Sequence, residues 1–266
     1  MHAPAEGPIA LSCGEPSGIG PEIAAKAWEQ LGARLPFFLI GDPGHLPKGT
    51  VWRDITHPEE ALSVSASALP VLPHAFPAPA TPGVPAPENA AHVLEVIARA
   101  VKLVSDGQAA ALCTAPIHKK ALKDGAGFAF PGHTEYLAHL AGVDRVVMML
   151  ACDALRVVPV TIHIPLSQVP ATLTADLLRK TIQITHDALI QDFGLTAPRL
   201  AVAGLNPHAG EGGAMGDEEI KLITPVIDDL RAEGLAISGP LSADTMFHTQ
   251  ARKRYDAAIC MYHDQA

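Results

Sequence analysis

The sequence has no apolar run approaching the roughly 20 residues that a membrane-spanning helix needs, although 48% of its 266 residues are hydrophobic. Its N-terminus, MHAPAEGPIALSCGEP, has no basic segment before a long apolar stretch, as a secretory signal would have. We therefore expect a soluble cytoplasmic protein with no membrane partner. The apolar residues are spread along the chain, which excludes a disordered protein and allows one or two packed domains.

The sequence also has no strongly basic block, and its formal net charge is −9. This argues against a nucleic-acid partner, and the charge itself mainly favours solubility. The cysteines form no CxxC pair, which argues against a zinc ribbon. Each lies in or beside an apolar stretch, so we expect buried free thiols at Cys13, Cys113, Cys152 and Cys260.

Apolar strand-like runs alternate with amphipathic helical stretches, which predicts an α/β fold with mainly parallel sheets. The strand-like runs cover residues 9–13, 37–41, 110–116, 199–207 and 256–263. The helical stretches cover residues 21–31, 88–107, 174–194 and 216–234. Two adjacent apolar runs, 145–152 and 155–165, predict a hairpin that turns near Asp153 and hence a mixed second sheet.

One segment differs in composition from the rest. Residues 69–89, LPVLPHAFPAPATPGVPAPEN, are rich in proline and alanine. Because proline removes amide donors and fixes φ, we predict an extended surface connection here rather than a core element.

Two motifs follow expected strands in the first half of the chain. GEPSGIGPE, residues 14–22, combines glycines with Pro21, which suits the first turn of a helix. A tight strand-to-helix turn and an anion-binding loop both fit it, and its spacing is neither GxGxxG nor a Walker loop. In CTAPIHKK, His118 and Lys119 are either a solvated helix start or ligand contacts beyond a strand end.

Two further motifs carry polar groups. In FPGHTEYLA, His133 and Thr134 begin a helical pattern, where they could hold a phosphate or a carboxylate. Thr134 could equally be an ordinary helix cap. In GPLSADTMFH, Asp244 follows a Gly-Pro turn and is a substrate contact, a partner for an imidazole, or simply a turn former.

Three histidines each stand at or just beyond the end of an apolar strand: His163, His208 and His263. Each alone could be an ordinary hydrogen-bonding group. Strand ends in one sheet can converge, however, and three neutral imidazoles would suit Zn²⁺ or a related ion while leaving a position open for substrate. The sequence HAGEGGAMG lacks the lysine and serine of a nucleotide loop, so its glycines are expected to let the backbone bend behind His208.

Taken together, these motifs resemble the 4-hydroxythreonine-4-phosphate dehydrogenase family of pyridoxal phosphate biosynthesis. The resemblance covers nearly the whole chain, and the motifs occur in the family's order: GEPSGIGPE, CTAPIHK, PGHTEYLA, HIPL, NPHAGEGGAMGDEE, GPLSADTMF and YDAAICMYHDQ. It implies a two-domain fold like that of isocitrate and isopropylmalate dehydrogenases, with the site in the cleft between the domains. We place the domains at residues 1–125 and 126–266, the second holding the metal site and the dimer interface.

The resemblance also implies residue roles. The family binds one divalent ion, most simply Zn²⁺ with Mg²⁺ or Co²⁺ as alternatives, through histidines that match His163, His208 and His263. His133 and Thr134 match its contacts to the phosphorylated substrate, and Asp244 is a catalytic candidate for proton handling. NAD or NADP is the expected oxidant, at residues not yet assigned. Family members are homodimers whose active sites draw on both subunits.

The implied reaction is oxidation of 4-phosphooxy-L-threonine to a 3-oxo acid, which decarboxylates to 3-amino-2-oxopropyl phosphate. Related enzymes oxidise phosphorylated sugar acids of the threonate or erythronate type, or dihydrodiols, and these are alternatives here. Family members continue past YHDQ with residues that complete the substrate site and the first domain. If that continuation is absent, we expect weak substrate binding and little turnover, which leaves a metal- or ligand-binding fragment as a further alternative.

Overall fold

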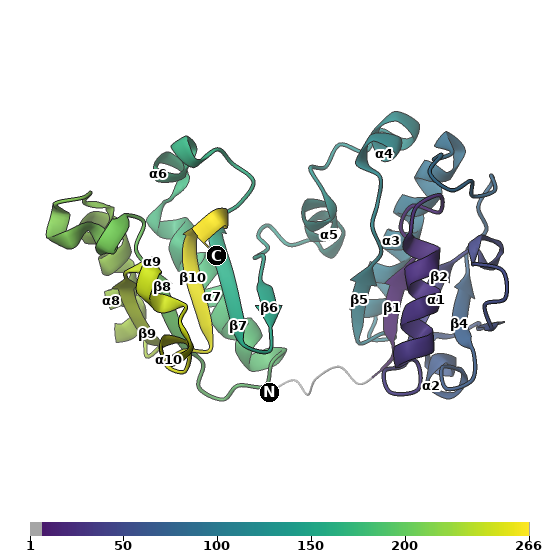
Figure 1. Ribbon diagram of the computed structural model, residues 1–266, viewed down its shortest axis with the longest axis horizontal. Coiled ribbons are helices and arrows are strands. Elements are labelled where there is room, and N and C mark those ends of the chain that lie inside the picture. The colour runs from purple at the N-terminus through teal and green to yellow at the C-terminus, as the bar shows by residue number, and fades with distance from the viewer. Residues whose placement is uncertain (1–6, 266) are drawn as a thin grey trace. The chain divides into compact units, whose positions relative to one another are not determined.

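The computed structural model describes residues 7–265, which form two α/β units divided between Asp144 and Arg145 (Figure 1). Each unit has its own five-stranded sheet. Within the described residues, no helix combines the length and apolar character needed to cross a membrane.

The sheet of the N-terminal unit is parallel throughout, in the order β3-β4-β2-β1-β5. Its strands are β1 (Ile9–Ser12), β2 (Phe37–Gly41), β3 (Trp52–Asp54), β4 (Leu69–Pro73) and β5 (Ala111–Thr114). Its helices are α1 (Gly20–Leu31), α2 (Ala61–Val64), α3 (Ala90–Ser105), α4 (Lys119–Ala126) and α5 (His133–Ala141). Every residue of β2 is buried, as expected for a central strand of a parallel sheet covered on both faces.

The sheet of the C-terminal unit is mixed, in the order β6-β7-β10-β8-β9, and only β6 runs antiparallel. Its strands are β6 (Leu150–Cys152), β7 (Leu155–Thr161), β8 (Arg199–Ala203), β9 (Ala236–Leu241) and β10 (Ala257–Tyr262). Its helices are α6 (Val169–Thr172), α7 (Ala175–Gln191), α8 (Thr224–Ala232), α9 (Ala243–Met246) and α10 (Thr249–Arg252). The predicted hairpin at Asp153 is confirmed, although its first strand is shorter than the apolar run 145–152.

Local signals place the long helix α7 where the sequence predicts it. The Thr174 side chain accepts a hydrogen bond from Leu177 N at 3.1 Å and caps the first turn. The helix ends shortly before Gly194, whose φ of +70° lies in the left-handed region that favours glycine. Leu178, Ile182 and Leu189 are fully buried and anchor the helix in the core of this unit.

The proline-rich segment is only partly the surface connection that its composition predicts. Its first five residues form β4, an inner strand between β3 and β2. Leu69, Val71 and Leu72 are at most 3% exposed, so their burial outweighs the donors that the prolines remove. The rest of the segment contains only an isolated bridge between Thr81 and Val84 and the short 3-10 helix Pro87–Asn89. Asn89 closes it by exchanging two hydrogen bonds of 3.0 Å with the backbone of Ala78.

The structure divides the chain later than the predicted position after residue 125. Helices α4 and α5 pack against α3 in the N-terminal unit. Phe128, Phe130 and Tyr136 contact one another, and the Tyr136 hydroxyl donates to the Leu94 carbonyl at 3.3 Å. The order of strands and helices in the sequence does not indicate these aromatic contacts, so it could not place α5 in the N-terminal unit.

The prediction of four buried thiols holds for only two. Cys13 and Cys260 are buried, and desolvation raises the pKa of each thiol to about 12. Cys113 and Cys152 are exposed because β5 and β6 are the edge strands of their sheets.

Candidate functional site

The three predicted metal-binding histidines follow three neighbouring strands of the C-terminal sheet. Strand β10 lies between β7 and β8, and all three run parallel. His263 directly follows β10, while His163 and His208 lie in the loops that leave β7 and β8. Since the carboxyl ends of parallel strands open on one edge of a sheet, the three imidazoles share that edge.

The structure brings two of these rings together and leaves the third in an adjoining hollow. The rings of His163 and His263 are 5.8 Å apart between centroids, and they line one hollow together with Tyr262. His208 lines a second hollow that also includes Tyr262. Among the described residues, these three do not form a group with all ligand atoms within 4.8 Å. Joint metal coordination therefore stays a prediction.

Hydrogen bonds tie the ends of the three strands to one another. Thr161 Oγ1 donates to the Met261 carbonyl at 2.8 Å, which joins β7 to β10. Gln265 accepts from Met261 N at 2.6 Å and donates to the Gly204 carbonyl at 2.7 Å, which joins β10 to the end of β8. The strand ends that carry the histidines are thus fixed relative to one another.

The loop that carries His208 is held by a buried carboxylate. Glu219 is 2% exposed and accepts hydrogen bonds from Asn206 N at 2.8 Å and from Asn206 Nδ2 at 3.0 Å. A Cβ at Gly210 would lie 2.7 Å from Glu219 Oε2, and the φ of Gly210 is +77°. The glycines therefore let the backbone bend tightly behind His208, as predicted.

Two of the three histidines have an unusual backbone conformation. The φ angles of His163 and His208 are 54° and 53°, a left-handed conformation that is uncommon outside glycine. Such conformations cost free energy and are concentrated at functional sites, where the surrounding structure imposes them. His263 lacks this feature and begins the short 3-10 helix His263–Gln265 that directly follows β10.

Asp244 lies beside His208 at the same edge of the sheet. It follows β9 on the short helix α9 and lines the hollow that includes His208 and Ser242. Ser242 Oγ donates to Asp244 Oδ1 at 2.5 Å. The second carboxylate oxygen has no hydrogen bond from the part of the chain described here, so it is available to a ligand.

His133 and Thr134 lie in the first turn of α5, in the N-terminal unit. The cap position is occupied by Gly132, so Thr134 is not the helix cap. His133 Nε2 is buried without a hydrogen-bond partner among residues 7–265. Burial, and secondly the charge of Lys119, lowers the pKa of His133.

The start of α5 has charged groups of both signs nearby. A Cβ at Gly132 would lie 3.3 Å from Lys119 Nζ, so this ammonium group is close to the first turn. The same Cβ would also lie 3.5 Å from Glu135 Oε2. The helix N-terminus, the ammonium group and the unpaired imidazole nitrogen favour an anion, whereas the Glu135 carboxylate opposes one. His118 has a different role, because its Nδ1 accepts from Ala121 N at 3.0 Å and caps α4.

The GEPSGIGPE loop is a tight strand-to-helix turn. A Cβ at Gly20 would lie 2.0 Å from the Cys13 carbonyl oxygen, and one at Gly14 would lie 2.4 Å from that of Pro116. Only glycine therefore allows α1 to start this close to β1. Glu15 is buried, and its backbone N–H donates to the Pro116 carbonyl at 2.9 Å. This bond fixes the loop against the segment after β5.

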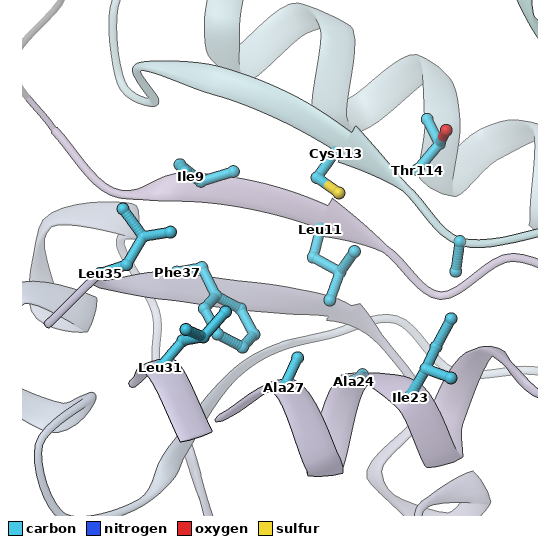
Figure 2. A pocket seen from close by; sticks show the side chains of 11 residues that line it. Ile9, Leu11, Ile23, Ala24, Ala27, Leu31, Leu35, Phe37, Cys113 and Thr114 are labelled. Carbon is cyan, nitrogen blue, oxygen red and sulfur yellow. The ribbon is translucent and has the colours of Figure 1, made fainter. Parts of the chain in front are cut away.

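An apolar pocket in the N-terminal unit is a poor match for a phosphorylated substrate. Figure 2 shows Leu11, Leu31 and Phe37 pointing into the space between α1 and the sheet, with Cys113 at its rim. The lining offers no charged group. The candidate site is therefore assigned to the polar strand ends and not to this pocket.

Several supporting residues of the site cannot be named from the sequence alone. Tyr262 lines both hollows, Gln265 bridges two strand ends, and Glu219 holds the loop. Gln265 and Glu219 lie within motifs that the sequence analysis singled out, but their partners come from distant segments. Only the fold identifies those partners.

Known proteins resemble this chain over nearly its full length. Residues 36–266 match the family model of the pyridoxal phosphate biosynthetic protein PdxA. A protein of Ruegeria sp. (strain TM1040) named 4-hydroxythreonine-4-phosphate dehydrogenase is 63% identical over 97% of this chain and 79% of the relative.

Solved structures agree with this assignment. That of 4-hydroxythreonine-4-phosphate dehydrogenase from Klebsiella pneumoniae has a TM-score of 0.88 and 35% identity, over 98% of this chain and 82% of that one. A terephthalate 1,2-cis-dihydrodiol dehydrogenase from Burkholderia xenovorans has a TM-score of 0.71 and 30% identity, over 98% of this chain and 80% of that one. The predicted isocitrate/isopropylmalate dehydrogenase-like α/β fold is confirmed, and the chain belongs to the PdxA family of pyridoxal phosphate biosynthetic proteins.

Proposed function

We propose that this chain oxidises 4-phosphooxy-L-threonine with NAD or NADP and a divalent ion, as a step of pyridoxal phosphate biosynthesis. The 3-oxo acid so formed would lose CO₂ to give 3-amino-2-oxopropyl phosphate. Family membership supports the reaction class, and relatives bear the name of this dehydrogenase. The observation that carries the site assignment is the placement of three histidines after three neighbouring parallel strands.

The residues at this edge have the right donors for a metal ion. His163, His208 and His263 would hold it, and imidazole donors fit Zn²⁺ or Co²⁺ better than Mg²⁺, which prefers oxygen. When bound, the ion would supply Lewis-acid stabilisation of negative charge on the substrate alcohol oxygen. Three protein ligands leave room for that oxygen.

Oxidation of the alcohol removes a hydride from carbon and a proton from oxygen. The nicotinamide would accept the hydride, and Asp244 would accept the proton. Its carboxylate faces the hollow of His208, and Ser242 holds one of its oxygens at 2.5 Å. Ser242 would thereby orient the free oxygen toward the substrate.

His133 and Thr134 would bind the phosphate group of the substrate. The unpaired Nε2 of His133 can donate a hydrogen bond, and the Thr134 hydroxyl can donate another. The charge of Lys119 adds attraction for a dianion. A homodimer with shared active sites remains part of the proposal on the family resemblance, and sedimentation velocity would test it.

A dihydrodiol is the second candidate substrate, since a structural relative 30% identical over 98% of the chain is a dihydrodiol dehydrogenase. A phosphorylated sugar acid of the threonate or erythronate type is a third. The test is a substrate panel with each cofactor, in which NADH or NADPH formation is followed by absorbance. Turnover of 4-phosphooxy-L-threonine above all others supports the proposal. Preference for an unphosphorylated diol, or metal binding without any turnover, would contradict it.

A further inference from the structure

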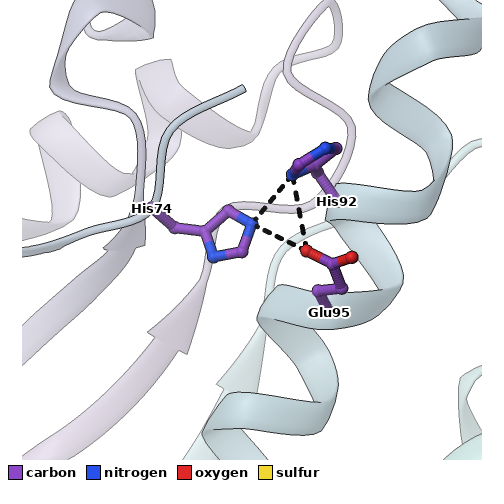
Figure 3. A group of neighbouring side chains, drawn as sticks. All are labelled: His74, His92 and Glu95. Carbon is purple, nitrogen blue, oxygen red and sulfur yellow. Dashed lines mark hydrogen bonds and ion pairs between the residues drawn. The ribbon is translucent and has the colours of Figure 1, made fainter. Parts of the chain in front are cut away.

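A second group of metal-ligating side chains lies in the N-terminal unit, where the proposed reaction does not use one. His74 directly follows β4, and its backbone N–H donates to the Gly41 carbonyl at 3.0 Å. His92 and Glu95 are three residues apart on α3, so they occupy one face of the helix. Figure 3 shows the three side chains pointing toward one another.

The three ligand atoms form a nearly equilateral triangle. His74 Nε2 is 3.2 Å from His92 Nδ1, and each of these nitrogens is 3.4 Å from Glu95 Oε2. Zinc binds nitrogen and oxygen at about 2.0–2.2 Å, and tetrahedral angles then place neighbouring ligand atoms about 3.4 Å apart. The triangle therefore has the dimensions of one face of a tetrahedral site.

Hydrogen bonds alone cannot satisfy all three contacts. Each ring nitrogen carries at most one proton and the carboxylate carries none. If one ring donates, the lone pair of the other nitrogen faces the carboxylate oxygen. If both rings donate to the carboxylate, their two N–H groups face each other at 3.2 Å. A cation between the three atoms attracts every lone pair at once.

The surroundings hold the rings in place and leave one side open. Phe76 packs against His74 and His92, with ring centroids 5.5 Å and 5.7 Å apart. The guanidinium of Arg99 donates to the Pro73 carbonyl at 2.8 Å. The Glu95 side chain is 58% exposed, so an ion can enter from solvent and keep a water as its fourth ligand.

We propose that His74, His92 and Glu95 bind a divalent ion of the Zn²⁺ or Co²⁺ type, in the unit that does not carry the three strand-end histidines. The ion joins the end of β4 to the first turns of α3. It thus closes the proline-rich connection at both of its ends. This role is structural and is independent of the proposed dehydrogenase reaction.

The test is metal titration of the whole chain after chelator treatment, with His208→Gln as the background that weakens the other proposed site. Calorimetry with ZnCl₂ measures stoichiometry, and CoCl₂ gives the visible absorption of tetrahedral Co²⁺. His92→Gln and Glu95→Gln should each weaken binding by more than about tenfold and remove the Co²⁺ bands. His45→Gln is the matched control, because His45 packs on Phe76 at 5.3 Å but lies outside the triangle.

Thermal unfolding gives an independent readout. In the His208→Gln background, Zn²⁺ should raise Tm clearly when His45→Gln is added and much less when Glu95→Gln is added. Glu95 is a surface side chain, so its variant is expected to fold, and circular dichroism checks this. If all three variants bind Zn²⁺ and Co²⁺ with equal stoichiometry and affinity, the triangle is a hydrogen-bonded cluster and the proposal is wrong.

Discussion

The two histidine clusters of this chain differ in how far the fold has assembled them. Two of the strand-end histidines, His163 and His208, have positive φ angles, and the rings of His163 and His263 are 5.8 Å apart. Among the described residues, the three do not bring their ligand atoms within 4.8 Å of one another. The ligand atoms of His74, His92 and Glu95 already lie within 3.4 Å of one another, and both imidazole rings pack against Phe76. An open, adjustable set suits a site that must admit substrate, whereas a preformed set suits a structural ion.

The largest expected effect comes from removing a strand-end histidine. His208→Gln should lower kcat/KM by on the order of 10³-fold or more, because it removes a ligand of an ion that supplies several kcal/mol of transition-state stabilisation. Steady-state kinetics with 4-phosphooxy-L-threonine measures this. His45→Gln, the matched change in the other unit, should keep its activity. Equal activity of the two variants would show that His208 is not needed for turnover.

A smaller loss is expected at Asp244. Asp244→Asn keeps the shape but removes the proton acceptor, so kcat should fall by about 10²–10⁴-fold while KM changes little. Ser242→Ala should have a weaker effect, since it only loosens the orientation of the carboxylate. If Asp244 is merely a turn former, the Asn variant loses thermal stability and retains its kcat.

Glu219→Gln separates the two metal sites in another way, because it alters the loop that carries His208 and removes no metal ligand. Replacing the charged acceptor weakens its two hydrogen bonds to Asn206, which should cost about 1–3 kcal/mol of unfolding free energy. Urea unfolding measures that loss. Metal binding at the strand ends should weaken as well, while binding by His74, His92 and Glu95 should not change. Loss of both sites together would indicate global unfolding.

The smallest effect concerns pH. Burial, followed by the charge of Lys119, lowers the pKa of His133 below its ordinary value of 6.5. The unfolded chain therefore binds a proton more readily here, and this group favours folding above pH 6.5 but loses that contribution as the pH falls. His133→Gln should flatten the decline in Tm on acidification. An unchanged pH profile would show that the group is not buried in solution.

Periodicity predicted most of the elements, and the order of strands and helices predicted the edge where the three histidines lie. The sequence-based predictions differ from the structure where burial in the tertiary fold outweighs local composition. Leu69, Val71 and Leu72 form an inner strand despite their prolines, and the aromatic contacts of Tyr136 move the unit boundary beyond residue 125.

The same limit applies to the sites. A His-x-x-Glu spacing at His92 and Glu95 is visible in the sequence, but nothing there indicates His74, which β4 brings to the same point. The strand-end histidines could be named from the sequence because each follows an apolar run. Their mutual distances depend on loop conformation, including positive φ angles at His163 and His208 that the residue types disfavour.

Metal dependence of turnover is the decisive measurement for the proposed ion at His163, His208 and His263. NADH formation from 4-phosphooxy-L-threonine would be measured before chelation, after it, and after adding back Zn²⁺ or Co²⁺. We expect activity to be lost on chelation and to return with metal in the unaltered and His45→Gln chains, but not in the His208→Gln or His263→Gln chains. Full turnover by a chain freed of metal, or restoration in the His208→Gln variant, would contradict this expectation.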